Sequence, residues 1–221
     1  ELEFIVPAIA LSTYGKVLQE DDVITISDVG DDYLMFSASE SGVKMRTSRV
    51  PGRFPQYVQI VPKSHDFRVK VDANWFKLKT QVSDVYARHS GKILRLEITP
   101  TVDQSMARLN IHAASDDAGH SDVQVGTSLE IESNDVEWPF RIGINSAFLK
   151  HALESCAELN PDGDDVVIGF NKPSTPITFW PASNGKGEPF TVVCMPMFIT
   201  KPGQVSARRV GFTAGPFCLW R

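Results

Sequence analysis

The segment FRVKVDANWFKLKTQVSDVYAR, residues 67–88, predicts a strand followed by an amphipathic helix. Apolar and polar residues alternate over residues 67–72, which is the period of a half-buried strand. The helix carries an apolar stripe at helical spacing, which we expect to face the core: Trp75, Leu78, Val82, Val85 and Tyr86. Residues 92–99, 105–114 and 121–133 predict three more strands.

The same order of strand, helix and three strands is predicted on either side of this unit. Before it come a short apolar run (2–6), a helix that starts near Pro7, and strands over 22–27, 32–38 and 43–50. After it come residues 140–144, a helix capped by Asn145, and strands over 165–171, 176–182 and 190–197. The third helix should bury Leu149, Ala152, Leu153 and Cys156.

Repetition at this scale indicates duplicated half-domains, whose sheets pack on their helices to bury a core. The second and third units lie in tandem and can complete one domain. The leading unit has no partner within these residues, so that either the chain is cut from a longer one or it recruits a partner.

Composition and cysteine spacing narrow the class of protein. With 221 residues, 42% hydrophobic and 22% charged, the chain is expected to be globular. Nothing approaches the roughly 18 consecutive apolar residues of a membrane span, and the first residues do not resemble a signal peptide, so we expect a cytoplasmic protein. The three cysteines, Cys156, Cys194 and Cys218, lack CxxC spacing and are expected to be buried reduced thiols.

Charge is distributed unevenly along the chain. The net charge is −5, yet residues 63–95 carry +5 and residues 114–165 carry −10. A basic region can face a polyanion while an acidic region keeps the protein in solution. Scattered, solvated charge is the alternative explanation of the same counts.

Catalytic and metal-binding motifs find little support. The five histidines fall at no metal spacing, and no HExxH, GxSxG or Walker-type loop is present. Carboxylates and an imidazole gather in residues 115–122, but a polar loop between two strands explains them better. Residues 160–165 and 184–187 are likewise expected to be turns. We therefore expect a non-catalytic protein without metal or cofactor.

Three motifs resemble those of bacterial sliding clamps, the β subunit of DNA polymerase III. The stretch GRFPQYVQIVP (52–62) is similar to the family's G-R-F-P-x-Y-x-x-[VI]-[LIV]-P segment between its second and third domains. The stretch IGINSAFL (142–149) resembles the family's I-G-F-N-x-x-Y/F-L, and VCMPM (193–197) resembles V-x-M-P-M. The three occur in the family's order and at its distances, and the resemblance covers residues 2 to about 199.

The resemblance implies an α+β fold, the DNA-clamp fold, in which β-α-β-β-β half-domains repeat with antiparallel sheets outside and helices on the inner face. Residues 1–62 would be the second half of the middle domain with the linker, and residues 63–199 a complete C-terminal domain. Residues 200–221 would be a basic tail, expected to be disordered. The family's first domain and the first half of its middle domain have no counterpart here, whether by nature or by a cut.

The function that the resemblance implies is that of a DNA sliding clamp, the processivity factor in DNA replication. Such a ring encircles double-stranded DNA without reading its sequence, and short linear motifs of DNA polymerase, clamp loader and repair proteins dock on it. It is not itself an enzyme, contacts no membrane, and would be a homo-oligomer if full length. The alternative is a truncated regulatory relative that binds such peptides without encircling DNA.

Family positions that match this sequence give the expected site residues. The peptide-binding groove would be walled by Pro55, Gln59, Ile60, Asn145, Phe148, Ser174, Pro176, Val193, Cys194, Met195, Pro196 and Met197. The helices facing DNA would present Lys16, Lys77, Lys79, Arg88 and Lys150, and the ring interface would use Val85 and Tyr86. The upstream groove wall has no counterpart in these residues, and Phe198 stands where the family commonly has arginine.

Overall fold

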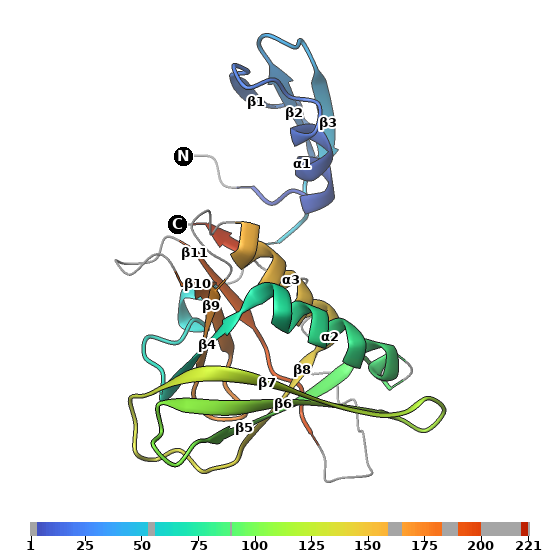
Figure 1. The fold of residues 1–221 in the computed structure, drawn as a ribbon. Coiled ribbons are helices and arrows are strands. Elements are labelled where there is room, and N and C mark those ends of the chain that lie inside the picture. Colours follow the sequence, from blue (N-terminus) through green and yellow to red (C-terminus); the bar gives the residue numbers. More distant parts are fainter. Residues whose placement is uncertain are drawn as a thin grey trace. The chain divides into compact units, whose positions relative to one another are not determined.

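The computed structural model of the protein describes residues 4–52, 56–88, 90–158, 165–182 and 190–199, and the backbone of residues 218–220. The chain divides into two compact units, Glu1–Tyr57 and Val58–Arg221, called here the N-terminal and the C-terminal unit. The elements follow one another as Figure 1 shows. Both units combine antiparallel sheets with few helices, so the α+β prediction is confirmed.

Among its described residues, the C-terminal unit contains one nine-stranded antiparallel sheet and two long helices. Its elements are β4 (Phe67–Asp72), α2 (Ala73–Ala87), β5 (Ile93–Pro100), β6 (Met106–Ser115), β7 (Gly119–Ile131), β8 (Phe140–Asn145), α3 (Ser146–Glu158), β9 (Asp165–Phe170), β10 (Ile177–Pro181), β11 (Phe190–Cys194) and β12 (Cys218–Trp220). A short 3-10 helix, Tyr57–Gln59, precedes them. The strand order is β12-β11-β10-β9-β4-β7-β6-β5-β8.

The two halves of this unit are joined by exchange of their first strands. β4 opens the first half but pairs with β9 of the second, from Phe67 opposite Phe170 to Asp72 opposite Asp165. β8 opens the second half and pairs with β5 of the first. Each half therefore completes the sheet of the other, and α2 and α3 lie side by side (Figure 1).

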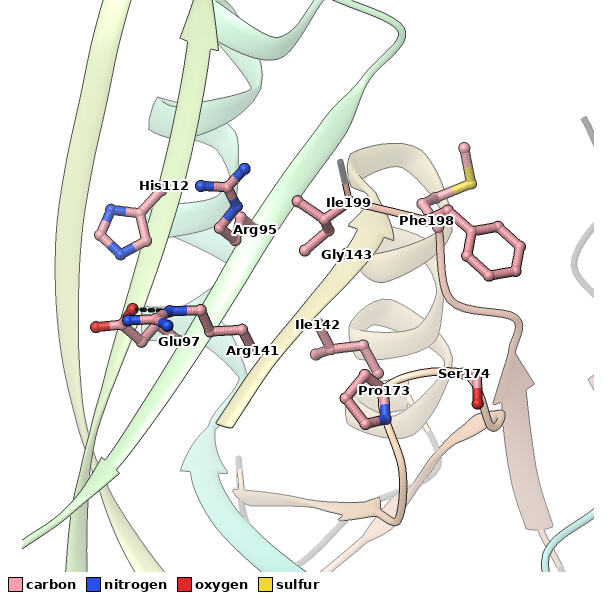
Figure 2. Close-up of a pocket in the computed structure, with 11 residues that line it drawn as sticks. Arg95, Glu97, His112, Arg141, Ile142, Gly143, Pro173, Ser174, Phe198 and Ile199 are labelled. Carbon is pink, nitrogen blue, oxygen red and sulfur yellow. Dashed lines mark hydrogen bonds and ion pairs between the residues drawn. The ribbon is translucent and has the colours of Figure 1, made fainter. Parts of the chain in front are cut away.

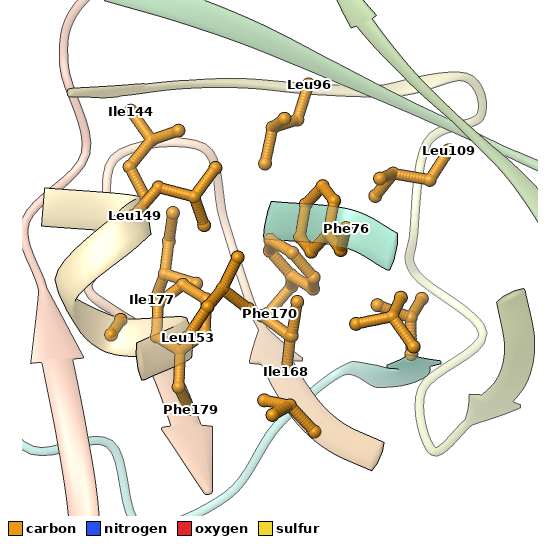
Figure 3. Packing of buried hydrophobic residues seen from close by; sticks show 14 of the residues in the cluster. Phe76, Leu96, Leu109, Ile144, Leu149, Leu153, Ile168, Phe170, Ile177 and Phe179 are labelled. Carbon is orange, nitrogen blue, oxygen red and sulfur yellow. The ribbon is translucent and has the colours of Figure 1, made fainter. Parts of the chain in front are cut away.

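Aromatic and aliphatic side chains from both halves fill a single core. The Phe67 ring lies 4.9 Å from Phe140 and 5.1 Å from Phe170, measured between ring centroids. The close-up in Figure 3 shows Phe76 of α2 and Leu149 of α3 reaching the same cluster. Because burying one large apolar side chain contributes about 1.5–3 kcal/mol, this shared core binds the two halves into one cooperative body.

The face of α2 that meets the core is not the face predicted from its apolar stripe. The buried residues are Ala73, Phe76, Thr80, Ser83 and Ala87. The stripe is half exposed at Trp75 (50%), Leu78 (48%), Val82 (47%) and Val85 (51%), so the prediction is wrong at these four positions, and only Tyr86 of the stripe packs against the core. Small side chains on the buried face let α2 lie close to β6 and β7, where Ser83 Oγ is 3.4 Å from Ser121 Oγ. The spacing of large apolar residues in a sequence does not reveal that a helix packs closely through small side chains.

The third helix packs as predicted. Leu149, Ala152, Leu153 and Cys156 are all buried. The Asn145 side-chain oxygen accepts a hydrogen bond from the Ala147 backbone N–H at 2.9 Å, as an N-cap does. The cap fixes where α3 begins, immediately after β8.

The N-terminal unit contains α1 (Ala8–Gly15) and a three-stranded sheet of β1 (Ile24–Asp28), β2 (Tyr33–Ala38) and β3 (Lys44–Ser48). Its buried cluster is small: Tyr14, Leu34, Phe36 and Ala38. The strand expected over residues 2–6 is not formed by its described residues 4–6, although Val50 N–H donates to Ile5 O at 2.8 Å. Asp22 accepts backbone hydrogen bonds that hold its pKa at about 2, the Gln19 N–H being the main cause.

Most of the C-terminal tail, residues 200–217, lies outside the described residues. The backbone of Cys218–Trp220 pairs with β11, with Phe190 opposite Trp220. The β11 edge offers backbone groups that this short strand satisfies, and the disorder expected of residues 200–221 stays a prediction. In the described part of the chain, every helix is too short or too polar to cross a bilayer.

A polar contact couples α2 to the start of α3. The Ser146 hydroxyl donates to Asp84, and Arg88 Nε lies 3.3 Å from Asp84 Oδ2. Burial opposes ionisation of Asp84, but the hydrogen bonds from Ser146 and Arg88 outweigh it, so the pKa of Asp84 lies below its ordinary value. The ionised carboxylate thus favours the folded state.

Replacing this carboxylate should change how stability depends on pH. Asp84→Asn is expected to lower the free energy of unfolding by about 1–3 kcal/mol at pH 7. The folded pKa is depressed, so the wild-type advantage is full above the unfolded pKa of about 3.9 and disappears as pH falls through the folded value. Denaturant melts of both proteins from pH 7 to pH 3 measure the difference. A difference that stays constant over this range would contradict the assignment.

Candidate functional site

The chain stays in contact with the sheet after β11 ends. β11 ends at Cys194, and Pro196 has no N–H to offer a neighbouring strand. At the next residue, the Met197 backbone N–H donates to Gly143 O of β8 at 2.8 Å. Because β8 is an edge strand at the other end of the sheet from β11, this contact joins the segment that follows β11 to that edge.

Glycine at position 143 has a packing reason. A Cβ atom there would lie 2.6 Å from Met197 O and 2.8 Å from Ile199 Cγ1. The segment 197–199 therefore rests on the bare backbone of β8. This explains why the stretch IGINSAFL needs its glycine for the segment VCMPM to reach its place.

The start of α3 contacts the residue just before the same segment. Cys194 is buried, and its Sγ lies 3.9 Å from Phe148 O. Phe148 packs partly buried against the core, whereas the Met195 side chain is 55% exposed. The segment is thus held against α3 at Cys194, and the flexible apolar side chain of Met195 is exposed to solvent.

The residues after the linker are held against the β9–β10 connection. Asn171 accepts a hydrogen bond from Asp66 N at 2.7 Å and donates to Ser64 O at 3.0 Å. His65 Nε2 lies 2.6 Å from Thr178 Oγ1, and burial lowers the pKa of His65. The connection that carries Ser174 and Pro176 is therefore bound to the segment that follows Ile60.

The expected groove residues are brought together in part. Ser174 and Met197 line one pocket, and Cys194 contacts Phe148. Val193 is half-buried in β11, and Gln59 and Ile60 are exposed. Asn145 caps α3 and Pro176 lies half-buried in the β9–β10 connection, while Pro55 falls outside the described residues.

A pocket that the sequence motifs did not indicate lies over β5 and β8 (Figure 2). Its cavity volume is about 660 Å³. Its lining includes Arg95, Glu97, His112, Arg141, Phe198 and Ile199. Strand alternation could have placed residues 95, 97 and 141 on the outer face of the sheet. It could not have shown that residues 173–174 and 197–199 complete the walls.

The helix cations expected to face DNA are mostly engaged within the protein. Lys77 Nζ lies 2.9 Å from Glu154 Oε1, and this hydrogen bond lowers the pKa of Glu154. Arg88 pairs with Asp84, and Lys79 Nζ lies 4.5 Å from the centre of the Trp75 ring. Lys150 is half-buried on α3, and Lys16 is exposed directly after α1.

The two residues expected at a ring interface differ in exposure. The Val85 side chain is 51% exposed, while Tyr86 packs partly buried against the core. Val85 thus extends the exposed apolar face of α2. The acidic stretch 115–122 forms the β6–β7 hairpin, with Ser115 opposite Gly119, and the described residues hold no group of three metal-ligating side chains.

Comparison with known proteins identifies the fold. No family model matches the sequence. The DNA polymerase III β chain of Streptococcus pneumoniae superimposes with a TM-score of 0.70 at 17% identity, over 90% of this chain and 48% of that one. The β subunit of Pseudomonas aeruginosa gives 0.68 at 18% identity, over 89% and 48%. A Pseudomonas aeruginosa sliding clamp bound to griselimycin gives 0.67 at 18%, over 89% and 47%.

This chain therefore has the fold of bacterial DNA sliding clamps and spans about half the length of the clamps it matches. The fold class expected from the three motifs is confirmed.

The fit of segment 197–199 on β8 can be tested at Gly143. Gly143→Ala should push this segment off the strand and lower the free energy of unfolding by about 1–3 kcal/mol, because the methyl group would meet the Met197 backbone and the branched side chain of Ile199. Gly126→Ala on β7 is the matched control, since no atom lies within 4 Å of the added carbon. Hydrogen exchange of Met197 N–H should accelerate in the first variant alone. Equal exchange rates in both would refute the packing role.

Proposed function

We propose that this chain is the C-terminal part of a DNA sliding clamp, a non-catalytic processivity factor of a replicative DNA polymerase that docks short linear motifs of its partners. The observation that carries the proposal is the segment Met195–Met197, fixed to β8 at Gly143 and exposed at Met195. Polymerase, clamp loader and repair proteins are the proposed partners, and the proposed compartment is the cytoplasm.

The chemistry of this segment suits a site with several partners. Methionine is unbranched and polarizable, so its side chain can repack around different apolar residues at low cost. The backbone beneath it is fixed by the contact with Gly143 and by the packing of Cys194 near Phe148. A rigid base with adaptable side chains binds peptides without first having to order itself.

Sliding on DNA would rely on the proposed helix cations, Lys16, Lys77, Lys79, Arg88 and Lys150. Movement along a duplex needs weak, sequence-independent phosphate contacts rather than base contacts. Cations already shared with Glu154 and Asp84 would make contacts of this weak kind. Val85 and Tyr86 are the proposed apolar part of the contact that closes a ring of several chains.

A second function is a relative that binds the same peptides without encircling DNA. The observation in its favour is the exposed face of α2, where Trp75, Leu78 and Val82 are apolar. In a clamp-like ring this face would be turned toward the duplex, and apolar side chains gain nothing from phosphates. The two functions share the peptide site and differ in DNA retention.

Peptide docking is tested with a fluorescein-labelled clamp-binding peptide of a bacterial replicative polymerase. Met195→Ala and Phe148→Ala should each weaken binding by about fivefold or more, the loss typical of an important interface residue. Met106→Ala is the matched control, because Met106 is 46% exposed on β6, away from the site. Fluorescence anisotropy measures all four proteins. Absence of binding by the wild type, or equal losses in all variants, would remove the basis for the proposal.

DNA encirclement is tested by retention on circular compared with linear duplex DNA. A clamp should stay on nicked circular DNA and slide off a linear duplex, and Lys77→Glu with Lys79→Glu should reduce retention further than Lys44→Glu, a control on exposed β3. Gel filtration of the protein with each DNA measures retention. Equal elution from circular and linear DNA would favour the non-encircling function.

A further inference from the structure

The pocket over β5 and β8 has two chemically different ends, which Figure 2 shows on opposite sides. Pro173, Phe198 and Ile199 make the apolar end, and the Phe198 side chain is 59% exposed. Arg95 and Arg141 belong to the other end. A cavity of about 660 Å³ is within the range of about 300–1,000 Å³ that small ligands or a few side chains fill.

Among the described residues, one positive charge at the polar end has no acidic partner. Arg141 Nε donates to Glu97 Oε2 at 2.6 Å, and His112 Nδ1 lies 3.2 Å from Asp122 Oδ2. Arg95 forms no ion pair with any acidic group in the described part of the chain. Its guanidinium group is therefore the one in this pocket that an incoming anion can engage without displacing an acid.

The strand register fixes Arg95 beside the proposed peptide site. Arg95 lies opposite Gly143 on β8, and the Gly143 carbonyl accepts a hydrogen bond from the Met197 N–H. Ser174 and Met197 line this pocket and also belong to the proposed peptide-binding set. A peptide that crosses Met195–Met197 can thus continue into the pocket along one surface of the C-terminal unit.

We propose that this pocket binds the acidic side chains, Asp or Glu, that flank a docked linear motif, with Arg95 as the main contact and Arg141 as the second. The inference rests on the proposed peptide docking and adds the charge of the preferred partner sequence. A guanidinium group presents planar paired donors that match a carboxylate, whereas Phe198 and Ile199 cover the methylene groups of the same side chain. Partners with acidic flanks are therefore selected over partners with neutral or basic ones.

Three labelled peptides test the inference by anisotropy. Each carries the same clamp-binding motif, flanked by uncharged residues, by two glutamates on its amino side, or by two glutamates on its carboxyl side. One acidic peptide should bind about threefold more tightly than the uncharged one at low salt, the effect of a partly exposed ion pair. The gain should shrink as salt is raised, because added ions screen such pairs.

The assignment to the pocket is tested by substitution. Arg95→Gln should remove the gain and leave the affinity for the uncharged peptide unchanged. Arg108→Gln, an exposed arginine of β6 that does not line this pocket, should retain the gain. Circular dichroism checks that both variants fold as the wild type does.

The failures of the two proposals can be told apart. If all three peptides bind equally, the acidic preference is wrong and peptide docking stands. If the gain persists in Arg95→Gln, the pocket is not its source. If none of the peptides binds, both the docking and the acidic preference are overturned.

Discussion

The exchange of first strands between the two halves of the C-terminal unit is the constraint on which the rest of the molecule depends. β4 satisfies its backbone groups on β7 and on β9, and β8 pairs with β5, so neither half has a closed hydrogen-bond network alone. The exchange also sets α2 beside α3, where Phe76 and Leu149 enter one core. The proposed peptide site also uses elements whose positions this pairing fixes.

The candidate site follows from how the sheet closes. Proline at position 196 follows the end of β11, and the glycine at 143 allows the next residues to rest on the edge strand β8. The methionines are therefore held at a junction of β8, α3 and β11 instead of at a free chain end. Rigid support beneath adaptable side chains is the arrangement that a surface with several partners requires.

The two faces of the unit differ in how their positive charges are paired. On the helices, Lys77 and Arg88 form ion pairs with acids, and α2 also exposes apolar side chains to solvent. On the outer face of the sheet, Arg95 has no ion pair with the described acids and lines the same pocket as Met197 and Ile199. These ion pairs reduce the positive potential that a polyanion would meet at the helices, while the outer pocket keeps a local charge suited to one carboxylate.

The sequence by itself determined the order of elements from α1 to β11, the buried face of α3, the Asn145 cap and the motifs that resemble sliding clamps, because each depends on the local spacing of residues. It did not determine the buried face of α2, since burial of Ala73, Thr80 and Ser83 depends on how closely β6, β7 and α3 approach. Nor did it show the outer pocket, whose walls come from segments around residues 95, 141, 173 and 198. Register and closure of the sheet bring these segments together, and local periodicity carries no information about either.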